Sequence, residues 1–250
     1  MWKWDWEWLK KLLHGDRKNY IERNPIDDAL EAQKPAPLPS DHPGKPREIA
    51  DFKFVDSSHH HPEFDVKAYA KASKLLINKT SQGTKMIDST HAKRQRLCKE
   101  SGVIYGGYHF FETSKNWKDQ LDHYMKAHGE FFIGPILDFE TWDGGGQTMT
   151  ELKKNIENAW EWMIEAEKRT GKKCILYAGY HVLVALQLPK KFERFIFWVP
   201  RYSSSIGKLP PPCNESNLMA WQFTESGEFP GFGKSNDVNI YYGKVNLLEL

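Results

Sequence analysis

From about residue 48 onward, short apolar runs alternate along the chain with amphipathic stretches of helical period. The apolar runs are rich in β-branched and aromatic residues and end at turn residues, as strands do. Less helix separates the later runs. The whole pattern favours an α/β fold in the form of a TIM-like (β/α) barrel of eight strands, with reduced helices in its last third. The predicted strands are Ala50–Val55, Leu75–Lys79, Val103–Phe110, Phe132–Phe139, Lys173–Tyr177, Phe195–Val199, Leu218–Phe223 and Val238–Tyr241, and the predicted helices are Val66–Ser73, His91–Ser101, Trp117–His128 and Met149–Arg169.

The first part of the chain differs from this pattern and divides the sequence into three regions. Residues 1–33 are a Trp-rich amphipathic segment, residues 34–47 are a Pro-rich linker, and residues 48–250 are the barrel. A helical period places one apolar face on the first segment. Such a helix suits a membrane surface or a partner protein, and packing on its own barrel explains the pattern equally well. The apolar face contains Trp2, Trp4, Trp6, Trp8, Leu9, Leu12 and Leu13.

Composition narrows the choice of partners. The net charge is only +2, with 27% charged residues, so no nucleic-acid partner is expected. No run of eighteen apolar residues predicts a membrane span, and the first residues lack the uninterrupted apolar core of a secretory signal. A protein of this kind that acts outside a cytoplasm would need release by a holin, a virion or a dedicated secretion system. Cys98, Cys174 and Cys213 match no zinc or redox spacing and are predicted to be buried thiols.

Two carboxylates at the end of one predicted strand carry the strongest chemical signal. Asp138 and Glu140 are two positions apart, so on a strand they would project from the same face, with Cα atoms about 6.5 Å apart. If one carboxylate stays ionised, it raises the pKa of the other and keeps it as a proton donor. Cleavage of a glycosidic bond needs such a pair. A salt bridge between a strand-end acid and a Lys or Arg is the structural alternative.

Two further acids extend this group. Asp56 closes the first predicted strand, and Asp237 precedes the last one. Each alone fits an ordinary turn or cap. Because chemistry in such barrels belongs at the carboxyl ends of the strands, acids from the first, fourth and eighth strands are expected to converge on one rim.

Histidines and aromatic residues at other strand ends suggest a ligand. The triplet that begins at His59 cannot easily face one metal ion, so a rim loop that touches substrate is favoured and no metal or other cofactor is expected. His109 ends the third predicted strand and would reach the rim, although an interior histidine is an equally good explanation. A cleft lined by flat rings and a few acids suits a carbohydrate polymer. The rings in question are Tyr177, Trp198, Tyr202, Trp221 and Phe223.

Eight short motifs, in order and at sensible spacing, resemble glycoside hydrolase family 25, the muramidase-type lysozymes of phages and bacteria. The resemblance covers roughly Phe52 to Tyr242. Ser57, which follows Asp56, departs from the aliphatic residue of many members. The motifs are Val55-Asp56-Ser57-Ser58-His59, Asn78-Lys79-Thr80-Ser81-Gln82-Gly83, Gly106-Gly107-Tyr108-His109-Phe110, Leu137-Asp138-Phe139-Glu140, Leu176-Tyr177, Phe197-Trp198-Val199, Ala220-Trp221-Gln222-Phe223-Thr224 and Asp237-Val238-Asn239.

The resemblance implies a β/α barrel that hydrolyses, with retention, the β-1,4 bond between N-acetylmuramic acid and N-acetylglucosamine in peptidoglycan. It implies that Glu140 is the proton donor and Asp138 its partner, with Asp56 and Asp237 as supporting acids. The nucleophile would be Asp138 or the N-acetyl group of the substrate. Contacts to the substrate are expected from His109, Tyr108, Lys79, Tyr177, Trp198, Trp221, Gln222 and His59.

The sequence is compatible with several other functions. A chitinase of the substrate-assisted barrel type would carry acids two and five residues before Asp138, where this chain has Ile136 and Ile133. A non-catalytic wall-binding or virion structural protein could use the same barrel. A metal-dependent amidase using the histidine triplet would lose activity with a chelator. A phage endolysin, a tail lysin and an exported effector all fit a muramidase of this kind.

Overall fold

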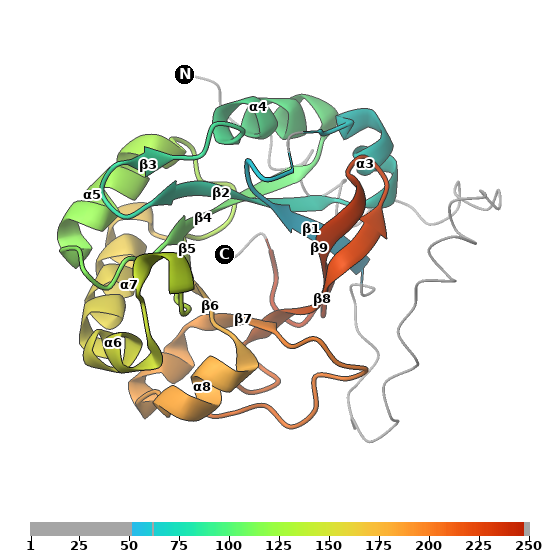
Figure 1. Cartoon of the computed structure of the whole chain (residues 1–250). Coiled ribbons are helices and arrows are strands. Elements are labelled where there is room, and N and C mark those ends of the chain that lie inside the picture. The colour runs from blue at the N-terminus through green and yellow to red at the C-terminus, as the bar shows by residue number, and fades with distance from the viewer. Residues whose placement is uncertain (1–51, 62, 248–250) are drawn as a thin grey trace.

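The computed structural model describes residues 52–61 and 63–247, and its centre is a closed barrel (Figure 1). Neighbouring strands pair in the order β1, β2, β4, β5, β6, β7, β8, β9, and β9 returns to pair with β1. A short strand of two residues, β3, pairs only with the end of β2. The strands are β1 (Phe52–Ser57), β2 (Leu75–Gln82), β3 (Met86–Ile87), β4 (Ile104–Phe110), β5 (Ile136–Asp138), β6 (Ile175–Tyr177), β7 (Ile196–Pro200), β8 (Leu218–Phe229) and β9 (Gly233–Tyr241).

The prediction of an eight-stranded α/β barrel with few helices is confirmed, with one difference in strand direction. All neighbouring barrel strands are parallel except β9, which runs antiparallel to both β8 and β1. The cause is a tight hairpin: only three residues separate β8 from β9, and a parallel connection would need a crossover of a dozen residues or more. The start of β9 therefore lies at the rim where the other barrel strands end.

Helices cover the outside of the barrel, and some of them differ from the sequence-based prediction. The predicted helix Met149–Arg169 is interrupted at Asn155, whose side-chain amide donates to the Glu151 carbonyl (2.9 Å). Helix α8 and the 3-10 turn η3 were not predicted, because they are short and lack a long amphipathic period. The helices are α3 (Val66–Ala72), α4 (His91–Ser101), α5 (Trp117–His128), α6 (Met149–Lys154), α7 (Ile156–Thr170) and α8 (Tyr180–Leu186), with 3-10 turns η2 (Asp143–Gly145) and η3 (Lys190–Arg194).

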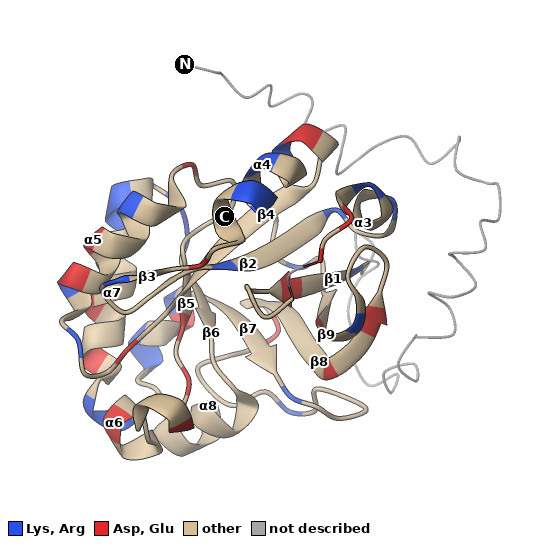
Figure 2. Ribbon diagram, turned by 45° about the horizontal axis from the view of Figure 1, so that its top comes forward, with Lys and Arg blue, Asp and Glu red and all other residues tan. Residues whose placement is uncertain are grey.

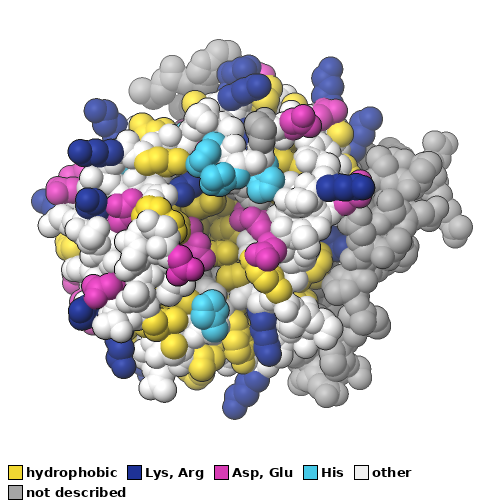
Figure 3. Space-filling view, viewed as in Figure 1, with side chains coloured by type: hydrophobic (Ala, Val, Ile, Leu, Met, Phe, Trp, Pro, Cys, Tyr) yellow, Lys and Arg dark blue, Asp and Glu magenta, His cyan; other side chains and the backbone are white. Residues whose placement is uncertain are grey.

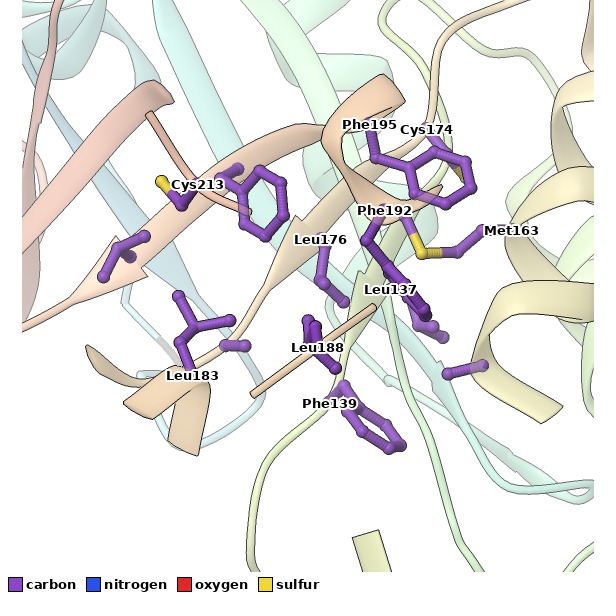
Figure 4. Packing of buried hydrophobic residues seen from close by; sticks show 14 of the residues in the cluster. Leu137, Phe139, Met163, Cys174, Leu176, Leu183, Leu188, Phe192, Phe195 and Cys213 are labelled. Carbon is purple, nitrogen blue, oxygen red and sulfur yellow. The ribbon is translucent and has the colours of Figure 1, made fainter. Parts of the chain in front are cut away.

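Apolar side chains form separate layers on the two sides of the barrel wall. Alternate residues of each strand point inward, and the residues between them point to the helices. Figure 4 shows part of the outer layer, where Leu137 and Leu176 of the barrel meet Met163, Phe192 and Phe195. The inner layer contains Phe54, Ile77, Ile104, Ile136, Ile175, Trp198, Ala220 and Tyr241. This alternation decides which of two adjacent residues on a strand points to the interior of the barrel.

Charge follows the same division between wall and surface. Lys, Arg, Asp and Glu gather on the outer helices, whereas the barrel strands carry few of them (Figure 2). The three cysteines are buried and free, as predicted. Within residues 52–61 and 63–247, no helix is long and apolar enough to cross a membrane. The predicted segments 1–33 and 34–47 lie outside the described residues.

Candidate active site

The acids predicted to converge do lie at one end of the barrel. Figure 3 looks onto this end and shows a hollow with acidic side chains on two sides, histidines on its border and hydrophobic side chains deeper inside. Asp56 follows the inward-facing Phe54 by two residues, and Asp138 follows Ile136 in the same way. Asp237 is the strand partner of Asp56. The antiparallel direction of β9 brings it there, because a parallel strand would have its start at the opposite end.

Asp56 is held by two side-chain amides on one wall of the hollow. Its Oδ1 accepts from Gln222 Nε2 (2.8 Å) and from Asn239 Nδ2 (2.7 Å). Both amides are oriented in turn, since Gln222 Oε1 accepts from the Tyr177 hydroxyl (3.1 Å) and Asn239 Oδ1 from Trp198 Nε1 (2.7 Å). The network therefore orients both the carboxylate and the two amides that bind it.

The electrostatics of this wall oppose full ionisation. Burial raises the pKa of Asp56 well above its usual range, Asp237 raises it further, and the two amide hydrogen bonds act in the other direction. Burial and Glu225 raise the pKa of Asp237 to about 7. Two carboxyls opposite each other on paired strands cannot easily both lose their protons. Close to neutral pH this pair consequently retains part of its protons.

Asp138 and Glu140 occupy the opposite wall, and their setting differs from the prediction in one detail. The predicted strand Phe132–Phe139 is only Ile136–Asp138, so Glu140 follows the strand instead of belonging to it. Both side chains nevertheless face the hollow, and their carboxyl groups are close enough for an electrostatic interaction. Burial and then Glu140 raise the pKa of Asp138, whereas Lys79 lowers it. Within the described part of the chain, Asp138 Oδ1 is a buried oxygen without a hydrogen-bond partner.

The pKa of Glu140 is raised into the range that a general acid would need. Burial raises its pKa to about 7, Asp237 raises it as well, and Lys79 opposes both. A carboxyl with a pKa near the working pH can donate a proton and then take one back. The same elevation distinguishes the acid from its carboxylate partner in glycosidases.

Lys79 is the cation among these acids. Its ammonium donates to Gln82 Oε1 (2.6 Å) and lies 4.8 Å from the centre of the Phe110 ring. Burial lowers its pKa, while Asp138 and Glu140 are among the acids that raise it again. A half-desolvated ammonium here stabilises ionised carboxylates on the β5 side of the hollow.

The predicted substrate contacts divide according to the direction of their side chains. Tyr108, Tyr177, Trp198 and Gln222 share the inward face with the acids. Burial and then Asp138 raise the pKa of the Tyr108 hydroxyl, in keeping with its place among the carboxyls. These residues can line a ligand site at the rim.

Two predicted contacts, His109 and Trp221, lie on the other side of the wall. His109 is fully buried against α5 and α7, where its Nδ1 pairs with Ser81 Oγ (2.9 Å) and its ring stacks on Trp162. Burial lowers its pKa to about 3. The indole of Trp221 belongs to the outer layer and donates to the Arg201 carbonyl (2.7 Å). Each is adjacent in sequence to an inward-facing residue, so the strand alternation directs it outward, and the prediction of direct substrate contact is corrected.

His59 lies at the rim, in a loop held by a buried acid. Asp88 Oδ2 accepts from the His59 backbone amide (2.8 Å) and pairs with its Nδ1 (2.8 Å), and Asp88 Oδ1 accepts from Thr90 Oγ1 (2.5 Å). Burial raises the pKa of Asp88, but the hydrogen bonds from Thr90 and His59 outweigh it and hold the pKa below its usual value. Among residues 52–61 and 63–247, no cluster of His, Cys, Asp or Glu is arranged to hold a metal ion.

The sequence-based prediction gave no role to Asn239 or Trp142 and named Tyr202 only as one of several rings of a cleft. Asn239 was quoted in a motif but given no role, although it is two positions from Asp237 and hence on the same face. Trp142 and Tyr202 are exposed aromatic residues. Trp142 follows Glu140 by two positions in the sequence, and the Tyr202 hydroxyl donates to Gln222, the side chain that binds Asp56. Trp142 lies outside the regular strands, so no periodic pattern in the sequence marked it. Tyr202 was named only as an aromatic residue near the end of a predicted strand.

The comparison with known proteins identifies the family. Residues 55–232 match the model of glycosyl hydrolases family 25, and the chain belongs to this family. Curated relatives include the uncharacterised protein YegX of Escherichia coli K12, which is 29% identical over 181 residues. That alignment covers 68% of this chain and 60% of YegX, so the chain spans less than two thirds of that relative's length.

Solved structures share the fold at low sequence identity. A bacterial lysozyme from Streptomyces coelicolor aligns with a TM-score of 0.68 at 19% identity, covering 80% of this chain and 96% of the other. A muramidase from Trichobolus zukalii aligns with a TM-score of 0.67 at 23% identity over 79% and 97% of the two chains. A family 25 glycosyl hydrolase from Bacillus anthracis gives 0.65 at 20% identity, over 80% and 92%.

Proposed function

We propose that this protein is a peptidoglycan hydrolase, an N-acetylmuramidase that cleaves the β-1,4 bond between N-acetylmuramic acid and N-acetylglucosamine. The observation that carries the proposal is Glu140, a partly buried carboxyl with a pKa of about 7 beside the buried Asp138 at the end of β5. Family membership and the names of the solved relatives, lysozyme and muramidase among them, support the same reaction.

In the proposed reaction Glu140 gives its proton to the glycosidic oxygen as the bond to the anomeric carbon breaks. It then accepts a proton from the water that attacks this carbon, so that the enzyme returns to its starting state. Asp56 and Asp237, on the opposite wall, stabilise the positive charge that develops near the anomeric centre. Net retention of configuration follows from two successive displacements.

We further propose that the first displacement is made by the 2-acetamido oxygen of the substrate, with Asp138 as its partner. Asp138 Oδ1 has no hydrogen-bond partner among the described residues, so it is free to accept from the acetamido N–H. That hydrogen bond orients the acetamido group and stabilises the charge it gains. Direct attack by Asp138 is the competing route, and a covalent glycosyl adduct on this residue would identify it.

Replacement of the general acid tests the proposal. Glu140→Gln keeps size and hydrogen bonding but removes the transferable proton, so clearing of purified cell walls should fall by about a thousandfold or more. Thermal unfolding of the variant serves as the control for an intact fold. Mass spectrometry of the digest made by the unaltered protein should find new reducing ends on N-acetylmuramic acid. Ends on N-acetylglucosamine, or cut peptide bonds, would refute the assignment, and wall binding without any cleavage would favour a non-catalytic protein.

The delivery route is a separate proposal. A phage endolysin or tail lysin suits a muramidase, and residues 1–33 are proposed to contact a membrane surface or a protein through Trp2, Trp4, Trp6 and Trp8. Comparing the full chain with a variant that lacks residues 1–46 separates targeting from catalysis. Lysis of intact cells should fall while hydrolysis of purified walls persists.

A further inference from the structure

Trp142 is an exposed indole two residues beyond the proposed general acid. It exposes 39% of its surface, and only Ile87, Val184 and Tyr202 are comparably exposed large hydrophobic residues in the described part of the chain. An aromatic ring left in water next to a cleft is a frequent sign of a ligand contact, because its apolar face is not used for packing. Nothing in the proposed proton transfers uses this residue.

The ring is held firmly despite its exposure. The Phe110 ring meets it edge-on, with centroids 5.7 Å apart and planes at 79°. The turn after it wraps closely around the indole: a β carbon on Gly144 would lie 2.8 Å from Nε1, and one on Gly145 would overlap the six-membered ring. These two positions therefore require glycine for the close approach. One face of the indole is packed, and its conformation is fixed before any ligand binds.

The same turn fixes Trp142 relative to Glu140. The backbone amide and carbonyl of Trp142 exchange hydrogen bonds with those of Gln147, both 2.9 Å. The buried Gln147 side chain donates to the carbonyls of Glu140 (2.7 Å) and Phe111 (2.9 Å) and accepts from the Thr113 amide (2.7 Å). One side chain thus joins the ends of β4 and β5 to the turn. The spacing between the acid and the indole is set by this clamp.

Phe110 connects the indole to the interior of the hollow. The other contact of its ring is Lys79, the cation that faces Asp138 and Glu140. Lysine, phenylalanine and tryptophan consequently form a continuous line from the acids to the outer rim. A ligand whose reacting bond lies at Glu140 would extend along this line onto the indole.

We propose that Trp142 is a stacking platform for the pyranose ring of an N-acetylated hexosamine, one sugar along the glycan strand from the cleaved bond on the β5 side. The C–H face of a pyranose is apolar and flat enough to pack on an indole, and the fixed ring loses little entropy on binding. This proposal rests on the proposed muramidase function. It adds a residue that sets affinity for the glycan and takes no part in the proton transfers.

Binding in an inactive background tests the platform directly. The probe is a peptide-free tetrasaccharide of alternating N-acetylglucosamine and N-acetylmuramic acid, measured by calorimetry in the Glu140→Gln protein. Adding Trp142→Ala should raise Kd about tenfold. Val184→Ala in the same background is the matched control, since Val184 is an exposed apolar residue of α8, and its Kd should not change. An unchanged Kd for the Trp142 variant overturns the proposal.

Kinetics separate a failure of the platform from a failure of the proposed function. With Glu140 intact, Trp142→Ala should raise KM about tenfold and alter kcat less than about twofold, as expected for loss of uniform binding. If the unaltered chain cleaves walls but this variant keeps the original KM, the platform alone is wrong. If the unaltered chain cleaves nothing yet its tetrasaccharide binding depends on Trp142, the muramidase function alone is wrong. Trp142→Phe keeps a flat ring and should stay within about threefold in Kd, which excludes misfolding as the cause.

Discussion

The two walls of the hollow hold the same chemical group in opposite ways. On the β1–β9 side, Asp56 receives two amide hydrogen bonds from Gln222 and Asn239, and both amides are oriented by other buried groups. On the β5 side, Asp138 has a buried oxygen with no partner among the described residues. One wall is complete before the substrate arrives, whereas the other offers an unused acceptor. The difference supports the proposed roles, in which Asp56 would supply a fixed field and Asp138 would make its bond to the substrate.

The largest expected effect on activity comes from a substitution of Asp138 on the β5 side of the hollow. Asp138→Asn leaves the shape but removes the charge and the acceptor pair that would orient the acetamido group. We expect kcat to fall by about a hundredfold to a thousandfold, measured as release of reducing sugar from purified walls. KM should change little, because the interaction belongs to the transition state. A variant with normal kcat would show that the unpaired oxygen has no catalytic role.

A substitution on the β1–β9 side should reduce activity less than Asp138→Asn does, and should reduce stability more. Asn239→Ala removes a donor to Asp56 and leaves the buried Trp198 N–H without its acceptor. The free energy of unfolding should fall by about 1–3 kcal/mol, and activity by about tenfold, as the pKa of Asp56 rises.

The matched control for this variant is Ser81→Ala. It removes a buried hydrogen bond to His109 on the outer side of the wall. Denaturant unfolding should show a loss of stability of similar direction, and wall clearing per folded molecule should be unchanged. Equal losses of activity in both variants would argue that the network around Asp56 has no special role.

The smallest expected effect is a shift of the pH profile when the cation between the walls is removed. Glu140 must be protonated to act as the acid, so kcat/KM declines as pH rises through its pKa of about 7. Lys79 lowers that pKa, and Lys79→Met should therefore move the alkaline limb upward by about half to one pH unit. Lys79→Arg keeps the charge and should leave the limb in place. A downward shift would contradict the assignment of Glu140 as the acid.

The fold, and the meeting of the four acids at one end of the barrel, could be predicted from the sequence because both depend on local pattern and order; the catalytic roles of the acids stay a prediction. Strand periodicity placed the early strands, and helices such as Trp117–His128 have the predicted bounds. The direction of the last strand could not be read from its own residues. It follows from the short hairpin connection, which the predicted strand ends at Phe223 and Val238 had concealed.

The strand period separates the predicted substrate contacts that face the hollow from those that point outward. His109 follows Tyr108, and Gln222 follows Trp221, so only one member of each pair can face the hollow. Counting in twos from the inward-facing Ile104 and Ala220 selects Tyr108 and Gln222. Trp142 had no comparable signal, because its exposure and fixed position depend on a glycine turn and the distant Gln147 side chain. Tertiary contacts of this kind leave no periodic pattern in the sequence.

The return of β9 to β1 has a consequence for when the proposed activity can first appear during synthesis. Asp237 and Asn239 belong to β9, which pairs with β1, so a chain translated only as far as β8 lacks part of one wall of the hollow. The proposed catalysis should then appear only after β9 has emerged and closed the barrel. A ribosome-bound or prematurely terminated chain that carries Asp138 and Glu140 but lacks β9 would be unable to attack the wall polymer, which would tie the proposed lytic activity to the synthesis of β9.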